Sequence, residues 1–339
     1  MTFSKISIVS LAAFLIFGLQ EVKSQDIHYS QFYASPLTLN PALTGKVNGS
    51  YRIAGIYRDQ WQGLFRTPSG SFDMPFIIGG NNMDALGAGL MISNDMQNDK
   101  TWNHLQVMAS VAYHKGLGSK GNHQLSLGIQ GGYVQKRLDQ QNLDFASEWD
   151  GRGFGDTQNG VNIDNNSATY GDFNAGLFYS GMLSKNFTIF TGFSLFHLFT
   201  PKEDFISGGD DQLARRYVAH GGLDWRVHKV LSILPGVYYQ SQASAREINF
   251  GNNFGIHVME KPGKEATLFL GAWYRWEDAV IAMAGLEYNK FRVGFSYDVT
   301  TSDLNNGVSQ NNAWEISLIY IGDIIRPTDD NLYLFCPRY

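Results

Sequence analysis

The stretch FRVGFSYDVT, residues 291–300, decides the fold class of this chain. Every second residue is large and apolar, and Arg, Gly, Ser, Asp and Thr fill the positions between them. Successive side chains of an extended strand point to opposite faces. The stretch therefore predicts a β-strand with one apolar and one polar face, the pattern of a strand with lipid on one side and a polar barrel lumen on the other.

The same alternation returns along the chain and predicts fourteen strands. Most are long enough for a tilted membrane strand of about 9–11 residues. We therefore expect an all-β fold, a transmembrane outer-membrane β-barrel of about 14 antiparallel strands within residues 51–321. A secreted soluble β-sandwich or repeat protein is the alternative, because its inner faces alternate in the same way. The expected strands lie near 51–58, 69–77, 85–93, 102–113, 123–134, 170–180, 186–196, 216–226, 231–240, 247–258, 266–275, 279–288, 291–299 and 313–321.

The connections between these expected strands differ in length. Bacterial outer-membrane barrels have short periplasmic turns and longer outer loops. If both ends of the barrel domain are periplasmic, the three longest gaps, 135–169, 197–215 and 300–312, all face outward. Aromatic residues near strand ends are expected to form girdles at the membrane interfaces. They are Trp61, Trp102, Tyr113, Trp225, Trp273, Tyr274, Trp276 and Tyr320.

The composition narrows the possible classes of protein. Charged residues make up 17% of the 339 residues, below the roughly 25% usual in soluble proteins, and aromatic residues make up 14%. The net charge of -5 marks no basic surface for nucleic acid. Cys336 is the only cysteine, which excludes an intramolecular disulfide and a zinc cluster built on several thiolates.

Residues 1–24 have the layout of a secretory signal peptide. Lys5 gives a positive start, and an apolar run of fourteen residues follows from Ile6 to Leu19. The run is too short for a comfortable transmembrane helix, which needs about 20 residues. We expect cleavage between Ser24 and Gln25, with an uncleaved N-terminal anchor as the alternative.

The string QDIHYSQFYASPLTLNPALTG, residues 25–45, closely resembles the mature N-terminus of the PorP/SprF family of type IX secretion proteins. Ile27 stands where that family commonly has proline, and Trp314 stands where it often has histidine. The likeness continues in order through Tyr57–Trp61, Arg215–Tyr217, His220–Gly222, Gly294–Thr300, Glu315–Leu318 and Cys336–Tyr339.

The resemblance implies an outer-membrane component of the type IX secretion and gliding machinery of Bacteroidota. Such a protein is expected to work with periplasmic ring subunits and to assist the export or surface attachment of adhesin-like cargo proteins. A general porin or small-molecule outer-membrane channel is the alternative function. None of these roles follows from composition or periodicity.

Residues 25–50 do not resemble a membrane strand, because Pro36 and Pro41 fix the backbone and remove hydrogen-bond donors. We expect this segment to fold into or against the periplasmic mouth as a plug or docking segment. A lid that only stabilises the barrel and an epitope that binds a partner both stay open. The tail, residues 322–339, is expected on the same side. The residues expected to form this partner or plug motif are Tyr29, Ser30, Gln31, Phe32, Tyr33, Pro36, Asn40 and Pro41.

The sequence offers no motif for catalysis. None of the eight histidines lies in a Gly-x-Ser-x-Gly or His-Glu-x-x-His context, so we expect no enzyme, no catalytic residue and no cofactor. Residues 150–166 are rich in Asp, Asn and Gly, which makes calcium conceivable. The spacing is not that of an EF-hand, however, and any exposed loop favours these residues. We therefore assign no metal site.

A polar lumen also raises the question of a pore. Arg292 alternates with the apolar face of its strand, and together with Asp298 it is expected to place charge in the lumen. These charges either line a channel or pair with each other or with a plug. Other arginines considered for the lumen are Arg52, Arg58, Arg137, Arg216 and Arg275.

Overall fold

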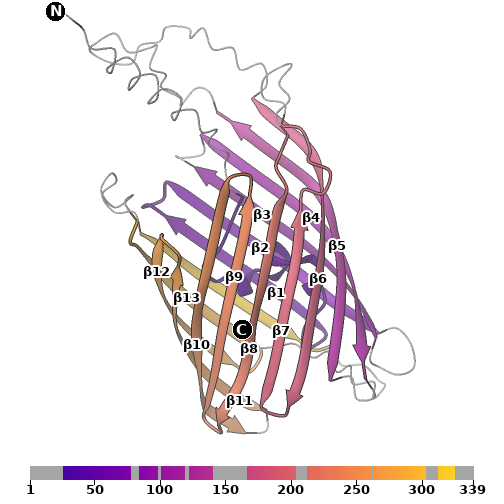
Figure 1. Ribbon diagram of the computed structural model, residues 1–339, viewed down its shortest axis with the longest axis vertical. Helices are drawn as coiled ribbons and strands as arrows, with labels where there is room; N and C mark the ends of the chain where they lie inside the picture. The colour runs from indigo at the N-terminus through magenta and orange to yellow at the C-terminus, as the bar shows by residue number, and fades with distance from the viewer. Residues whose placement is uncertain are drawn as a thin grey trace, which may run out of the picture.

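A computed structural model of the chain describes residues 26–77, 84–97, 101–118, 122–139, 166–203, 212–261, 263–302 and 312–324. Fourteen antiparallel strands within these ranges form a closed barrel (Figure 1). Each strand pairs with its neighbours in sequence, and β1 (Tyr51–Gln60) closes the barrel against β14 (Ala313–Gly322). The others are β2 (Phe65–Ile77), β3 (Ala85–Gln97), β4 (Trp102–Leu117), β5 (His123–Leu138), β6 (Ser167–Ser184), β7 (Phe187–Phe196), β8 (Arg216–His228), β9 (Leu231–Gln242), β10 (Ala245–Lys261), β11 (Lys264–Arg275), β12 (Ala279–Tyr288) and β13 (Phe291–Thr300).

The alternation in the sequence matches the two faces of the barrel wall. In β13, Phe291 and Phe295 are exposed on the outer face, whereas Ser296 and Asp298 are buried on the inner face. Apolar side chains such as Ile129, which is 63% exposed, continue this outer belt around the barrel. An apolar surface of this extent requires lipid around it. The predicted fourteen-strand membrane barrel is therefore confirmed, and the closed sheet rules out the sandwich.

Several strands extend beyond their predicted ends. β6 was expected over 170–180 and runs from Ser167 to Ser184, and its pairing with β5 reaches Arg137 opposite Ser167. The apolar and polar alternation fades there, because both faces of a strand meet water once it leaves the membrane. Backbone pairing continues without that pattern, which is why the sequence underestimates the length of the tall strands.

The two ends of the barrel differ in their connections. At the end where β1 begins, here named the turn end, connections run from two residues at 289–290 to seven at 78–84. The opposite end, named the loop end, carries the three longest connections, 139–166, 197–215 and 301–312. No helix in the described ranges is both long and apolar enough to cross a membrane.

Candidate functional site: a plug in the barrel lumen

The N-terminal segment folds into three short helical turns inside the barrel (Figure 1). Pro36 and Pro41 each occupy the first position of a turn, where the missing N–H costs nothing and the fixed φ suits a helix. Asn40 caps the last turn by accepting a hydrogen bond from the Ala42 N–H. We name residues 26–47 the lumen plug. Its turns are η1 (Phe32–Ala34), α2 (Pro36–Leu39) and η2 (Pro41–Leu43).

The lumen plug crosses the barrel from one end to the other. Asp26 lies at the loop end, where its backbone N–H donates to Gln242, the last residue of β9. Lys46 lies at the turn end, where its ammonium group binds Gln124 near the start of β5. The segment thus penetrates much farther than the predicted position at the periplasmic mouth.

Apolar packing fixes the middle of the plug to the wall. Phe32 stacks on Tyr238 with ring centroids 5.1 Å apart and meets Trp273 edge-on at 5.5 Å. Leu39 and Leu43 belong to the same buried cluster. Trp273 was expected in an interfacial girdle, but only 4% of it is exposed. It points inward because the plug offers it an aromatic partner, and the sequence gives no sign of that partner.

Glycines in the wall leave room for the plug. A Cβ atom on Gly128 of β5 would lie 2.3 Å from the carbonyl carbon of Pro41, and one on Gly87 of β3 would lie 1.9 Å from the Thr44 oxygen. Because these neighbours are backbone atoms, neither has a flexible side chain to move aside. The lumen wall is therefore shaped around this particular segment. Gly176, Gly192 and Gly294 approach plug side chains in the same way.

A buried charged cluster, which we name the Ser30 latch, holds the plug near the loop end. The Glu315 carboxylate accepts hydrogen bonds from the Ser30 N–H at 2.7 Å and from Arg58 at 2.5 Å. Asp298 accepts from the Ser30 hydroxyl at 2.6 Å and from Arg275 at 2.8 Å. Charged hydrogen bonds of this kind are strong, and removing one partner leaves the others buried and unpaired. The latch consists of Ser30, Arg58, Arg275, Asp298 and Glu315.

Asn40 anchors the centre of the plug. Its side-chain amide donates to the carbonyl oxygen of Leu177 at 3.0 Å and more weakly to that of Phe193 at 3.4 Å. Ser194 of β7 donates in turn to the Leu39 carbonyl at 2.8 Å. The backbone of the plug does not pair with a strand, so its polar groups bind side chains of the wall instead. Buried polar groups need such partners.

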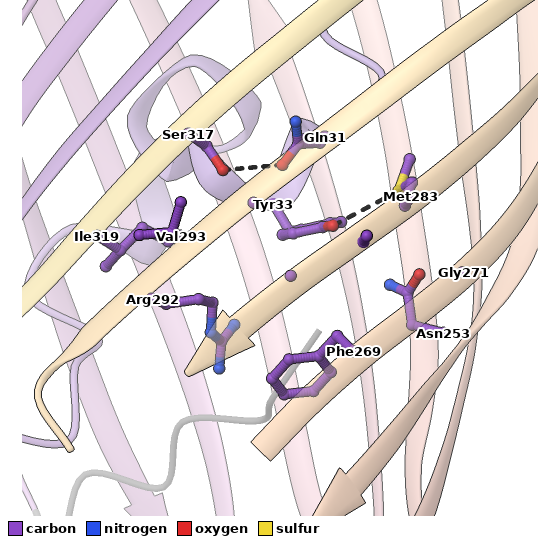
Figure 2. Close-up of a pocket in the computed structure, with 13 residues that line it drawn as sticks. Gln31, Tyr33, Asn253, Phe269, Gly271, Met283, Arg292, Val293, Ser317 and Ile319 are labelled. Atoms are coloured by element: carbon purple, nitrogen blue, oxygen red, sulfur yellow. Dashed lines mark hydrogen bonds between the residues drawn. The ribbon is translucent and has the colours of Figure 1, made fainter. Parts of the chain in front are cut away.

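The other predicted motif residues also lie in the lumen. Gln31 accepts a hydrogen bond from Ser317 of β14, and the Tyr33 hydroxyl points to the sulfur of Met283 at 3.5 Å (Figure 2). Tyr29 is 3% exposed. The structure thus brings all eight motif residues together inside the barrel, and their role as a partner or plug motif stays a prediction. They are Tyr29, Ser30, Gln31, Phe32, Tyr33, Pro36, Asn40 and Pro41.

The predicted lumen charges have separate positions. Asp298 belongs to the Ser30 latch. Arg292 is half-buried, pairs with Glu287 and lies over the ring of Phe269. Arg137 is exposed on the outer face and does not enter the lumen, because Lys136 takes the inward position beside it. The signal-peptide cleavage site at Ser24 and Gln25 and nearly all of the loop 150–166 lie outside the described residues.

A cavity of about 300 Å³ opens beside the plug at the turn end, and we name it the turn-end vestibule. Plug residues Pro36, Leu43 and Val47 form one side of it. A smaller cavity adjoins it and is lined by Tyr33, Arg292, Phe269 and Met283 among others (Figure 2). Both cavities are lined by residues of β11 to β14.

A histidine at the loop end binds two carboxylates, one of which belongs to the plug. His197, just beyond β7, binds Asp26 through Nε2 at 2.5 Å and Asp172 through Nδ1 at 3.0 Å. Burial acts to lower the pKa of His197, but the charge of Asp26 and the hydrogen bonds to both carboxylates raise it to about 9. Burial acts to raise the pKa of Asp26, but the charges of His197 and Arg216 hold it well below its usual value.

The raised pKa of His197 gives a pH-dependent prediction. The stabilisation is fully present below the unfolded pKa of about 6.5 and is lost as the pH rises through about 9. We expect His197→Asn to lower the free energy of unfolding by on the order of 2 kcal/mol at pH 6 and by much less at about pH 10. Thermal unfolding of both proteins across this range measures the difference. An equal gap at both ends of the range would contradict the ion pair.

The sequence matches the model of a known protein family over most of its length. The family model described as "Type IX secretion system membrane protein PorP/SprF" matches residues 21–320. This chain belongs to the PorP/SprF family. Family membership and the apolar outer belt of the barrel together make it an outer-membrane protein of the type IX secretion system. No curated protein matches the chain.

Solved structures similar to this PorP/SprF protein are other outer-membrane barrels. The toluene transporter TodX of Pseudomonas putida shares 11% identity, covers 87% of this chain and 94% of its own, and gives a TM-score of 0.49. The Ralstonia pickettii toluene transporter TbuX shares 10% identity, with 84% and 92% covered and a TM-score of 0.47. At such identities and TM-scores, these barrels say nothing about what this protein binds or transports.

Proposed function

We propose that this PorP/SprF protein is a sealed docking component of the type IX machinery. It assists the export or surface attachment of adhesin-like cargo, supports gliding, and contacts periplasmic ring subunits. It acts neither as a general porin nor as an enzyme. Membership of the family supports the place in the machinery, and the lumen plug supports the rest of the proposal.

The observation that carries the proposal is the filling of the lumen. A porin keeps a water-filled channel, whereas here the wall and the plug share buried apolar packing, and buried carboxylates of the wall bind Ser30 of the plug. A barrel sealed in this way interacts with other proteins through its two ends. The long connections place the loop end on the outer side of the membrane, where it would bind cargo. The short turns place the turn end on the periplasmic side, where it would bind ring subunits.

The buried position of the motif also bears on the choice between a lid and a docking epitope. Tyr29, Phe32 and Asn40 all face the lumen wall, so a ring subunit meets them only after the plug has left the barrel. The geometry favours a plug that stabilises and seals. Ring subunits would then bind the exposed turns and the vestibule at the turn end.

The position of the Ser–His pair on β4 and β5 supports the proposal that this protein is not an enzyme. Ser126 and His114 lie 2.7 Å apart, but both are fully buried beneath the plug, and the second ring nitrogen of His114 binds the Thr44 carbonyl. A nucleophile needs access to substrate as well as a base. We expect a fluorophosphonate probe to leave Ser126 unmodified in the folded protein, and labelling of Ser126 would overturn this part of the proposal.

Chemical crosslinking in native outer membranes, followed by affinity capture of this protein, tests the docking role. We expect recovery of periplasmic ring subunits, a large surface adhesin, or both. An unrelated barrel captured from the same membranes serves as the control and is expected to recover neither. Recovery of nothing, together with a large steady conductance of the purified protein, would favour the porin.

A further inference from the structure

The outward face of the wall becomes polar at the loop end in one row across β8, β9 and β10, which lie side by side (Figure 1). In this row Tyr217 pairs with Ser241, and Ser241 pairs with Arg246. Tyr217 and Arg246 are exposed, whereas their chain neighbours Arg216 and Glu247 are buried in the lumen. Because successive side chains of a strand point to opposite faces, the row lies on the outer surface of the barrel.

This row lies at the edge of the apolar outer belt. One row nearer the turn end, Tyr239 pairs with Ile248, and in the row after that Val237 pairs with Phe250. Ile248, Val237 and Phe250 are exposed apolar side chains. Apolar side chains on the outer face of a membrane barrel meet acyl chains, and the polar side chains beyond them meet headgroups. Arg246 therefore lies at the depth of the lipid headgroups.

Arg215 adds a second guanidinium group beside this row. It is exposed and lies two residues before Tyr217, on the side of the loop tips. Its Nε donates to the Leu198 carbonyl at 3.2 Å, which holds the side chain in place and leaves the two terminal NH₂ groups for another acceptor. Two strand spacings of about 4.8 Å, or roughly 10 Å, separate β8 from β10. Both arginine side chains can therefore reach one headgroup.

We name Arg215, Tyr217, Ser241 and Arg246 the arginine patch. Among the described residues, no carboxylate pairs with either arginine, and Arg246 forms no hydrogen bond. Arg226 at the turn end, by contrast, pairs with a carboxylate at 2.6 Å. Two positive charges without a counter-charge at headgroup depth attract an anionic group.

The donors of the arginine patch suit a phosphate. A guanidinium group presents parallel N–H donors that match two phosphate oxygens, and it is more weakly hydrated than an ammonium group. The hydroxyl groups of Tyr217 and Ser241 lie between the two arginines in the row and supply further donors. In the proposed orientation, the loop end meets the outer leaflet, where glycolipids carry phosphate on their sugars.

We propose that the arginine patch binds the phosphate of a glycolipid headgroup of the lipopolysaccharide class. The acyl chains of this lipid lie over Ile248 and Phe250, and its phosphate lies between Arg215 and Arg246. The inference uses the proposed orientation of the barrel but neither of its proposed protein partners. A failed lipid test therefore leaves the docking role untouched.

Native mass spectrometry of the mature protein released from detergent micelles tests the site. The probes are purified lipid A and the same lipid A after enzymatic removal of its phosphate. We expect the wild type to bind the phosphorylated lipid at least about tenfold more tightly. The Arg215→Gln/Arg246→Gln variant is expected to bind both lipids equally. Both substituted side chains are exposed, so the barrel is expected to fold as the wild type does.

The matched control removes two exposed cations at the turn end. Lys115 and Arg226 pair with Asp84 and Glu260 there, so Lys115→Gln/Arg226→Gln is expected to keep the full preference for phosphate. Equal binding of both lipids by the wild type would overturn the proposal. A preference that survives in Arg215→Gln/Arg246→Gln, or that falls equally in the control, would overturn it as well.

Photocrosslinking of the wild type gives a second test that needs no variant. A lipid A that carries a photoreactive group beside its phosphate is mixed with the purified protein, illuminated, and the labelled peptides are read by mass spectrometry. We expect labels in residues 215–217 and 241–246. Labels confined to other parts of the barrel would show that the phosphate lies elsewhere and that the proposal is wrong.

Discussion

Replacing Glu315 by alanine is expected to lower the free energy of unfolding by about 3–5 kcal/mol. Glu315 is fully buried and accepts hydrogen bonds from Arg58 and from the backbone N–H groups of Ser30 and Gln31. Without the carboxylate, part of the charge of Arg58 and two plug N–H groups lose their partner out of reach of water. Urea unfolding of the barrel in detergent or lipid, followed by tryptophan fluorescence, measures the effect.

A surface carboxylate provides the matched control. Glu260 pairs with Arg226, but its side chain is 50% exposed. Glu260→Ala is expected to cost less than about 1 kcal/mol, because water replaces the lost partner. A cost for Glu315→Ala as small as that for Glu260→Ala would mean that the Ser30 latch does not hold the plug.

Adding a single methyl group to the wall is expected to loosen the plug. In Gly128→Ala the new carbon would lie 2.3 Å from the backbone of Pro41, so the plug or β5 must move. Overpacking of this kind typically costs 1–3 kcal/mol, which corresponds to a roughly 5- to 150-fold larger population with the plug displaced. Because Lys46 is 1% exposed in the folded barrel, trypsin cleavage after Lys46 reports that population.

Gly70→Ala controls for the loss of a strand glycine. A Cβ atom on Gly70 would meet nothing closer than the Ala54 oxygen at 3.9 Å. Cleavage after Lys46 is expected to be as slow in Gly70→Ala as in the wild type and faster in Gly128→Ala. If both variants were cleaved at the rate of the wild type, the close fit between β5 and the plug would be refuted.

The strands could be predicted from the sequence because alternation is a local pattern. Residues 291–300 carry their outer and inner faces in ten consecutive positions, and the structure has β13 over the same ten residues. The strand ends were less accurate for tall strands such as β6, where the membrane no longer imposes an apolar face.

The plug could be predicted only as a segment that is not a strand. Pro36 and Pro41 exclude it from the sheet, and the family resemblance marks it, but neither fixes its depth in the barrel. That depth depends on contacts between residues far apart in sequence. Ser30 binds Glu315, which lies 285 positions later in the sequence. Gly128 packs closely against Pro41, and no sequence motif links these two residues. The prediction that Trp273 belongs to an interfacial girdle was wrong for the same reason, because its partner Phe32 lies in the plug.

We infer that this PorP/SprF barrel is sealed by its own N-terminal segment. The most direct test is single-channel recording of the purified wild-type protein in planar lipid bilayers, with a known porin as the positive control. The structure predicts a silent protein without steady conductance, because the lumen plug packs against the wall from the loop end to the turn end. A large and steady conductance of the wild type would contradict it.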